Sequence, residues 1–114
     1  MKILNRADVE LIDDTCGKIQ ELHHSDNMSL AYLTITGKAK SHKHEILEEV
    51  YYIVKGRGLM NLGDESFDVK EGDVIPIPKK IFHSIEKASE EPLEVFVTTY
   101  PRFDPNDVIE KEGN

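Results

Sequence analysis

Short runs of apolar or alternating residues, separated by turn residues, occupy the chain from residue 28 to residue 100. The runs are rich in β-branched and aromatic residues, which is typical of β-strands. The spacing of apolar residues that marks an α-helix is not sustained over several turns anywhere. The pattern therefore predicts an all-β sandwich or barrel with little helix. The expected strands are residues 28–36, 40–44, 49–55, 57–62, 66–70, 73–77, 82–86 and 93–100.

Two of these runs predict different kinds of strand. Residues 50–54 (VYYIV) are continuously apolar, so we expect a strand that is buried on both faces. Residues 66–70 (SFDVK) alternate, so one face of that strand should contact water. Tight reversals are expected at the glycines between strands, such as Gly56 and Gly72.

The segment that follows the last expected strand, residues 101–114, has a different character. Asp104 and Pro105 suit the start of a single helical turn. The same residues also suit an irregular strap across the barrel. The sequence leaves both interpretations open.

Composition and charge narrow the class of protein. With 114 residues, 39% of them hydrophobic, the chain suits a single domain, residues 1–114, around one core. Fourteen basic and twenty-two acidic residues give a net charge of −8, which repels nucleic acids and anionic membrane surfaces. We expect neither as a partner. The sequence has no run of about 18 apolar residues and no apolar leader, so we expect a cytoplasmic protein.

Three residues of types that often act as nucleophiles or metal ligands are not expected to do so in this chain. Cys16 is the one cysteine, so it cannot form an intramolecular disulfide, and we expect a small buried apolar side chain. His23 and His24 are neighbours, which would point to opposite faces of an extended chain. We interpret them as loop residues rather than as ligands of a shared metal ion.

The other three histidines suggest a metal site. His42 and His44 are two apart in an expected strand, so both imidazoles project from the same face. Glu49 opens the next strand, and His83 lies near the start of a later one. Glu48 should turn away from this face. Three imidazoles and a carboxylate suit one divalent ion of Fe, Mn, Co, Ni, Cu or Zn better than Mg²⁺ or Ca²⁺, and they leave coordination positions open.

Two segments around these residues resemble the two conserved motifs of the cupin superfamily. Residues 37–56 (GKAKSHKHEILEEVYYIVKG) are similar to motif 1, and residues 72–87, which begin GDVIPIPKKIFH, are similar to motif 2. The resemblance implies a jelly-roll barrel, a double-stranded β-helix, with His42, His44, Glu49 and His83 as metal ligands. The chain departs from the motifs at Lys80, where the family has glycine, at Lys87, where it has asparagine, and in a spacer one residue shorter before His42. A lysine at a positive φ angle carries a steric cost.

Strand alternation identifies two candidate residues for contact with a substrate. Lys40, two before His42, and Tyr51, two after Glu49, should face the metal side. Tyr51 suits a hydrogen-bond donor or acid, and equally a core tyrosine. Lys40 suits the solvated rim of the barrel just as well. Lys79 and Lys80 precede His83, so they are candidates for attracting an anionic substrate to the barrel mouth.

The ligand set alone does not select a reaction. Small cupins of this kind resemble mannose-6-phosphate isomerase-like proteins, which implies a metal-dependent enzyme acting on a sugar derivative or carboxylic acid. Dioxygenases and decarboxylases share the fold, and a non-catalytic module that binds metal or a small molecule is the alternative of another class. Cupin barrels commonly pair, so we expect a homodimer that buries Val9, Leu11 and Ile12.

Overall fold

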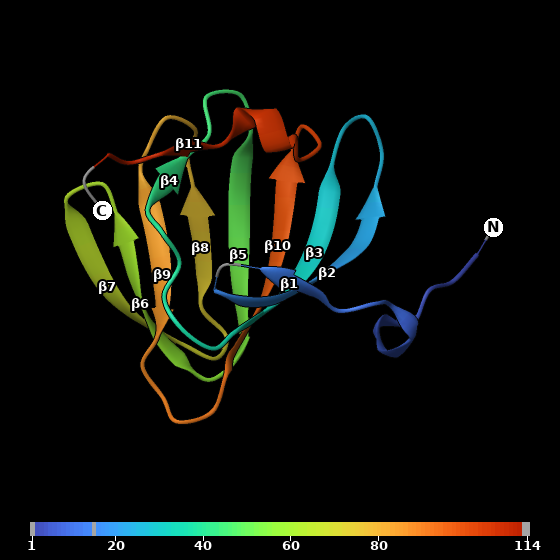
Figure 1. The fold of residues 1–114 in the computed structure, drawn as a ribbon, viewed down its shortest axis with the longest axis horizontal. Helices are drawn as coiled ribbons and strands as arrows, with labels where there is room; N and C mark the ends of the chain where they lie inside the picture. Colours follow the sequence, from blue (N-terminus) through green and yellow to red (C-terminus); the bar gives the residue numbers. More distant parts are fainter. Residues whose placement is uncertain (1, 15, 113–114) are drawn as a thin grey trace.

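Two antiparallel β-sheets face each other in the computed structural model, which describes residues 2–14 and 16–112 (Figure 1). The six-stranded sheet has the order β1 (Ile12–Asp14), β2 (Gly17–His24), β3 (Ser29–Ile35), β10 (Leu93–Tyr100), β5 (Glu48–Lys55) and β8 (Val74–Ile77). The five-stranded sheet has the order β11 (Ile109–Glu110), β4 (His42–Lys43), β9 (His83–Lys87), β6 (Arg57–Leu62) and β7 (Glu65–Lys70). The predicted all-β jelly roll is confirmed.

Helical structure in the described residues is limited to two single 3-10 turns, η1 (Arg6–Asp8) and η2 (Pro105–Asp107). The side chain of Asp104 accepts a hydrogen bond from the backbone N–H of Asn106, and Pro105 fills the first turn, as in the helical interpretation of this segment. No helix in residues 2–14 and 16–112 is long and apolar enough to cross a membrane.

The core lies between the sheets and is built by alternation. In β5, Glu49, Tyr51 and Ile53 are buried, whereas Val50 and Tyr52 are 36% and 45% exposed. The prediction that residues 50–54 are buried on both faces is therefore wrong. The outer face of this sheet contacts water, and its apolar side chains remain there because β-branched and aromatic residues suit a strand even when one face is wet.

Most expected strands are present, but three were missed. They are β1, β2 and β11. His23 and His24 belong to β2 and not to a loop. Strand β2 carries Lys18, Gln20 and Glu21 among its residues, so its apolar alternation is weak, and its place is determined by the ladder of backbone hydrogen bonds to β3.

The C-terminal segment is both a helical turn and a strap. After η2, Ile109 pairs with Lys43 and Glu110 pairs with His42, which adds β11 to the edge of the second sheet. The backbone N–H of Lys111 also donates to the carbonyl of Ser41. The strap thus lies beside β4, which carries the candidate metal ligand His42 and is directly followed by His44. Residues 113–114, the end of the predicted strap, lie outside the described residues.

The N-terminal arm extends away from the barrel (Figure 1). Gln20 holds its base, since its side-chain N–H groups donate to the carbonyls of Arg6 and Val9 at 2.8 and 3.0 Å. Ile3, on the N-terminal side of this anchor, is 99% exposed. On its C-terminal side, Leu11 and Ile12 are about half exposed, and β1, which begins at Ile12, is an edge strand of the sheet.

An exposed edge strand with apolar side chains favours pairing with a second copy. We therefore expect light scattering to give a dimeric mass at micromolar concentration, and we expect Ile12→Glu to shift it toward the monomer. Val74→Glu is the matched control, because Val74 is 59% exposed on β8 at the opposite edge of the same sheet. A monomeric wild type, or a dimer lost only in the Val74 variant, would contradict the assignment to this edge.

Candidate metal centre

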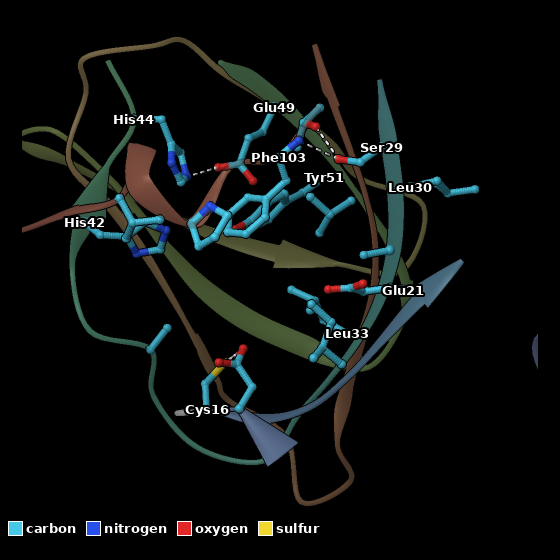
Figure 2. A pocket seen from close by; sticks show the side chains of 18 of the residues that line it. Cys16, Glu21, Ser29, Leu30, Leu33, His42, His44, Glu49, Tyr51 and Phe103 are labelled. Atoms are coloured by element: carbon cyan, nitrogen blue, oxygen red, sulfur yellow. Dashed lines mark hydrogen bonds and ion pairs between the residues drawn. The ribbon is translucent and has the colours of Figure 1, made fainter. Parts of the chain in front are cut away.

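Four side chains from three strands and one loop converge between the sheets. His42 lies in β4 and pairs directly with His83 in β9, His44 directly follows β4, and Glu49 is the second residue of β5. One ligand atom of each residue lies within 4.8 Å of one ligand atom of every other. The structure thus brings together the four residues that the sequence nominated. In Figure 2, His42, His44 and Glu49 line one side of a cavity.

Three buried atoms in this cluster have no hydrogen-bond partner. The Oε1 atom of Glu49 lies 3.0 Å from Nε2 of His44 and 3.0 Å from Nε2 of His83. Nevertheless, none of the three atoms makes a hydrogen bond to the described part of the chain. Their residues are only 1–7% exposed. Buried polar atoms without partners are costly, so three of them around one point indicate a site built for an ion.

Backbone carbonyls determine which imidazole nitrogen faces this point. The Nδ1 atoms of His42, His44 and His83 lie 3.0, 2.6 and 3.1 Å from the carbonyl oxygens of Lys40, Asp107 and Ile81. A carbonyl only accepts, so each Nδ1 must donate its proton to it. In a neutral ring the Nε2 lone pair is then free, which is the arrangement usual for metal-bound histidine.

The pKa values of the cluster follow from its burial and its charges. Burial acts to raise the pKa of Glu49, but the imidazoles of His44 and His83 outweigh it and lower that pKa to about 2. Burial acts to lower the pKa of His44, but the Glu49 carboxylate and the Asp107 carbonyl raise it above its usual value. Burial lowers the pKa of His42, with a smaller contribution from the neighbouring histidines. Glu49 is therefore ionised near neutral pH.

Asp107 supports the cluster and was missed by the sequence analysis. Its carboxylate is 7% exposed and accepts three backbone hydrogen bonds from the loop between His44 and Glu49. The N–H of Glu45 donates to Oδ1 at 2.9 Å, and those of Ile46 and Leu47 donate to Oδ2 at 3.1 Å each. Burial acts to raise the pKa of Asp107, but these donors lower it below its usual value. The same residue holds His44 through its carbonyl, so it positions two candidate ligands.

A cavity of about 590 Å³ opens beside the cluster, and the two residues nominated for substrate contact both line it. Tyr51 is 5% exposed, and its ring centroid lies 6.4 Å from that of His83. Burial raises its pKa well above its usual value, so the hydroxyl remains a proton donor. Lys40 has a half-exposed side chain whose Nζ forms a 2.8 Å ion pair with Glu110. Its place is at the rim.

The role of Lys79 and Lys80 in attracting an anionic substrate stays a prediction. Both are exposed and neither lines the cavity. Lys80 adopts a left-handed conformation, with φ 70°, and its backbone N–H donates to the carbonyl of His44 at 2.6 Å. The turn therefore keeps the conformation expected of the glycine that it replaces, at a steric cost of about 1 kcal/mol. Its contribution to the site comes from the backbone.

Two further expectations concern residues outside the cluster. Cys16 is buried and lines the end of the cavity opposite Glu49 (Figure 2), and burial raises its pKa to about 11, so the thiol is a poor nucleophile at neutral pH. Glu48 is exposed and points away from the cluster, as alternation predicts.

Comparisons with known proteins identify relatives of this chain. The family model described as cupin domain matches residues 29–99. An uncharacterized protein of Methanocaldococcus jannaschii is 40% identical over 96 residues, which cover 78% of this chain and 77% of that protein.

Solved structures share the fold at low identity. Pac13 of Streptomyces, a nucleoside dehydratase, superposes with a TM-score of 0.85 and 14% identity over 97% of this chain and 91% of its own. KdgF from Halomonas sp. superposes with a TM-score of 0.83 and 19% identity over 91% and 96%. At these identities the likeness shows the fold alone.

Proposed function

Because this chain belongs to the cupin family, we propose that it binds one divalent transition-metal ion through His42, His44, Glu49 and His83 and uses the ion in catalysis. The observation that carries this proposal is the set of three buried ligand atoms without hydrogen-bond partners. The orientation of all three imidazoles supports it, since each Nε2 is left free by a backbone carbonyl.

The donor set suits a catalytic ion rather than a structural one. Three nitrogen donors and one oxygen donor fit Fe, Mn, Co, Ni, Cu or Zn, and an ion that prefers five or six ligands keeps open positions. His42, His44 and Glu49 line the cavity, so an ion held by them would be accessible to a ligand in the cavity. When bound, the ion would act as a Lewis acid toward an oxygen atom of the substrate.

The residues of the chain supply the remaining functions. Glu49 is ionised and offsets one charge of the ion. The hydroxyl of Tyr51 offers a hydrogen bond to a substrate oxygen in the cavity. His44, Glu49 and His83 are buried, and electrostatic interactions at a buried site are stronger than in water.

A metal-dependent isomerase of the mannose-6-phosphate isomerase-like type is the first candidate activity, and a dioxygenase or decarboxylase is the second. Metal analysis of protein purified without added metal, followed by turnover assays on sugar phosphates and carboxylic acids, tests the proposal. Oxygen uptake with bound iron would move the assignment to an oxygenase. Bound metal without any turnover would favour the non-catalytic binding module. Protein without bound metal that also fails to take up added metal would contradict the proposal.

The affinity for the metal should fall with pH. Protons compete with the ion for the imidazoles, and His44 is the ligand whose pKa is raised, so it takes up a proton first as the pH falls. We expect roughly a tenfold loss of affinity per pH unit below about pH 6.5, the usual value for histidine. His42, whose pKa is lowered, should add to the slope only at lower pH.

Competition with a chromogenic chelator from pH 5 to pH 8 measures this slope. Glu49 contributes no slope in that range, because its pKa is near 2. An affinity that does not change with pH would mean that the ion is held by carboxylates elsewhere rather than by these histidines.

A further inference from the structure

The wall of the cavity beyond the candidate metal ligands is apolar. It is formed by inward-facing residues of β2, β3, β9 and β10 and by the segment that follows β10. The side chains that face the cavity are Ile19, Ala31, Leu33, Ile85, Val97 and Phe103. Figure 2 shows Leu33 across the cavity from His42 and Glu49. A ligand that reaches from the metal site into the cavity would meet mostly carbon atoms, with the Glu21 carboxylate beside Leu33 (Figure 2).

Several polar groups of this wall already have partners. The hydroxyls of Ser29 and Thr99 form a short hydrogen bond with each other, and the Ser29 hydroxyl also accepts from the backbone N–H of Phe103 at 3.1 Å. Lys40 and Glu110 neutralise each other at the rim. Within residues 2–14 and 16–112, the charged lining groups without a hydrogen bond or ion pair include Glu21 and Arg102, which are both exposed. The deeper wall therefore has few polar atoms to offer a ligand.

The metal centre itself selects the charge of the ligand's head. A divalent ion held by the carboxylate of Glu49 and three neutral imidazoles would leave one positive charge in a buried site. A residual buried charge is costly unless an opposite charge lies beside it. One negative charge on the ligand would balance the site, and the hydroxyl of Tyr51, which lines the cavity beside Glu49, would add a hydrogen bond to the same head.

We propose that the ligand of this site is a small monoanionic oxygen chelator with a compact apolar body, such as an aromatic or branched-chain acid, rather than a polyhydroxylated sugar. The inference rests on the proposed metal binding, and of the two substrate classes considered above it favours carboxylic acids over sugar derivatives. The apolar body displaces water from the carbon wall, which favours binding in proportion to the area buried. The hydroxyls of a sugar would lose their hydrogen bonds to water and find no partners in that wall.

Hydroxamates that share one chelating head test the inference. Acetohydroxamate, benzohydroxamate and gluconohydroxamate differ only in a methyl, a phenyl or a polyhydroxylated body. Calorimetry on the metal-loaded protein should show benzohydroxamate binding at least about tenfold tighter than acetohydroxamate. Gluconohydroxamate should bind no tighter than acetohydroxamate.

Three variants assign the effect to residues. Val97→Thr places a hydroxyl in the wall at nearly constant volume and should reduce the preference for the phenyl body severalfold. Val50→Thr makes the same change on the outer face of β5, where the side chain is 36% exposed, and should leave the preference unchanged. Tyr51→Phe should weaken all three hydroxamates by a common factor, because it removes a hydrogen bond to the head.

The outcomes separate this inference from the proposed function. A protein that takes up no metal would contradict both the proposed function and this inference. Protein that takes up metal but binds the methyl and phenyl probes equally, or binds the polyhydroxylated probe tightest, overturns the apolar ligand and leaves the metal site in place. An equal loss of preference in the Val50 and Val97 variants also overturns it, because the wall would then not be the source of the preference.

Discussion

Replacing His44 with alanine should abolish high-affinity metal binding, with a loss of at least about 100-fold in affinity. His44 is 3% exposed, and its Nε2 atom, 3.0 Å from Glu49, has no hydrogen-bond partner in the described structure. Changes to residues that merely orient a ligand cost 10–100-fold, so the loss of a ligand should cost more. Elemental analysis and titration with a chromogenic chelator measure the loss.

Two variants make this result specific. His24→Ala removes an exposed histidine from the rim and should leave the metal content unchanged. Glu49→Gln keeps the size of the side chain but removes its charge, so it tests the site even if the His44 variant folds poorly. Circular dichroism should show the same β-sheet content in all three proteins. If both the His44 and the Glu49 variants keep the wild-type metal content, the ion is bound elsewhere in the protein.

Most strands of the barrel and the shared face of His42 and His44 were predictable because they depend on short-range patterns. Alternation within β5 places Glu49, Tyr51 and Ile53 on one face, and the spacing of His42 and His44 places both imidazoles on one side. These relations hold for any extended strand. The position of His83 beside His42 was available only from the resemblance to the cupin motifs, because 41 residues separate the pair in the chain.

Features that depend on long-range contacts were not predictable. Strand β2 is polar in sequence and becomes a strand because β3 offers a backbone ladder. Lys79 and Lys80 lie close to His83 in sequence, but the turn directs their side chains to solvent and uses the Lys80 N–H instead. The sequence placed Lys80 near the site but did not predict that its backbone N–H would contact the carbonyl of His44.

The contact between the C-terminal strap and the loop of residues 45–47 is another long-range feature that was not predictable. Asp107 is 62 residues from Glu45, and its neighbours in sequence suggest only a capped turn. A signal did exist, since η2 contains an acidic residue that no part of the turn uses. Only the fold shows that this carboxylate meets the three N–H groups of the loop before Glu49. The ligand geometry thus depends on a segment outside both motifs.

Asp107→Asn should loosen the metal centre and lower the stability of the barrel. An amide has one acceptor oxygen, so its NH₂ group would face at least one of the N–H groups of Glu45, Ile46 or Leu47. A buried N–H without an acceptor costs about 1–3 kcal/mol, and the lost carboxylate charge adds to this, so we expect about 2–4 kcal/mol less stability. The metal should dissociate about 10–100-fold faster, because the loop that positions His44 and Glu49 is no longer held.

The pH dependence of the same interaction has a defined sign. The pKa of Asp107 is lowered in the folded protein, so its contribution is complete above the usual aspartate value near 4 and is lost as the pH falls through the folded pKa. The difference in unfolding free energy between wild type and Asp107→Asn should therefore be constant from pH 5 to pH 8 and shrink below about pH 4. Urea denaturation at several pH values measures this difference.

Asp73→Asn is the control that separates positioning from general stability. The side chain of Asp73 also accepts a hydrogen bond from a backbone N–H, that of Lys70, at 2.8 Å. Asp73 directly precedes the first residue of β8, whereas Ile77, which pairs with Glu49, is the last residue of that strand. Asp73→Asn should lower the unfolding free energy and leave the rate of metal dissociation at the wild-type value. If both variants lose stability and neither releases metal faster, Asp107 supports the fold alone and does not position the ligands.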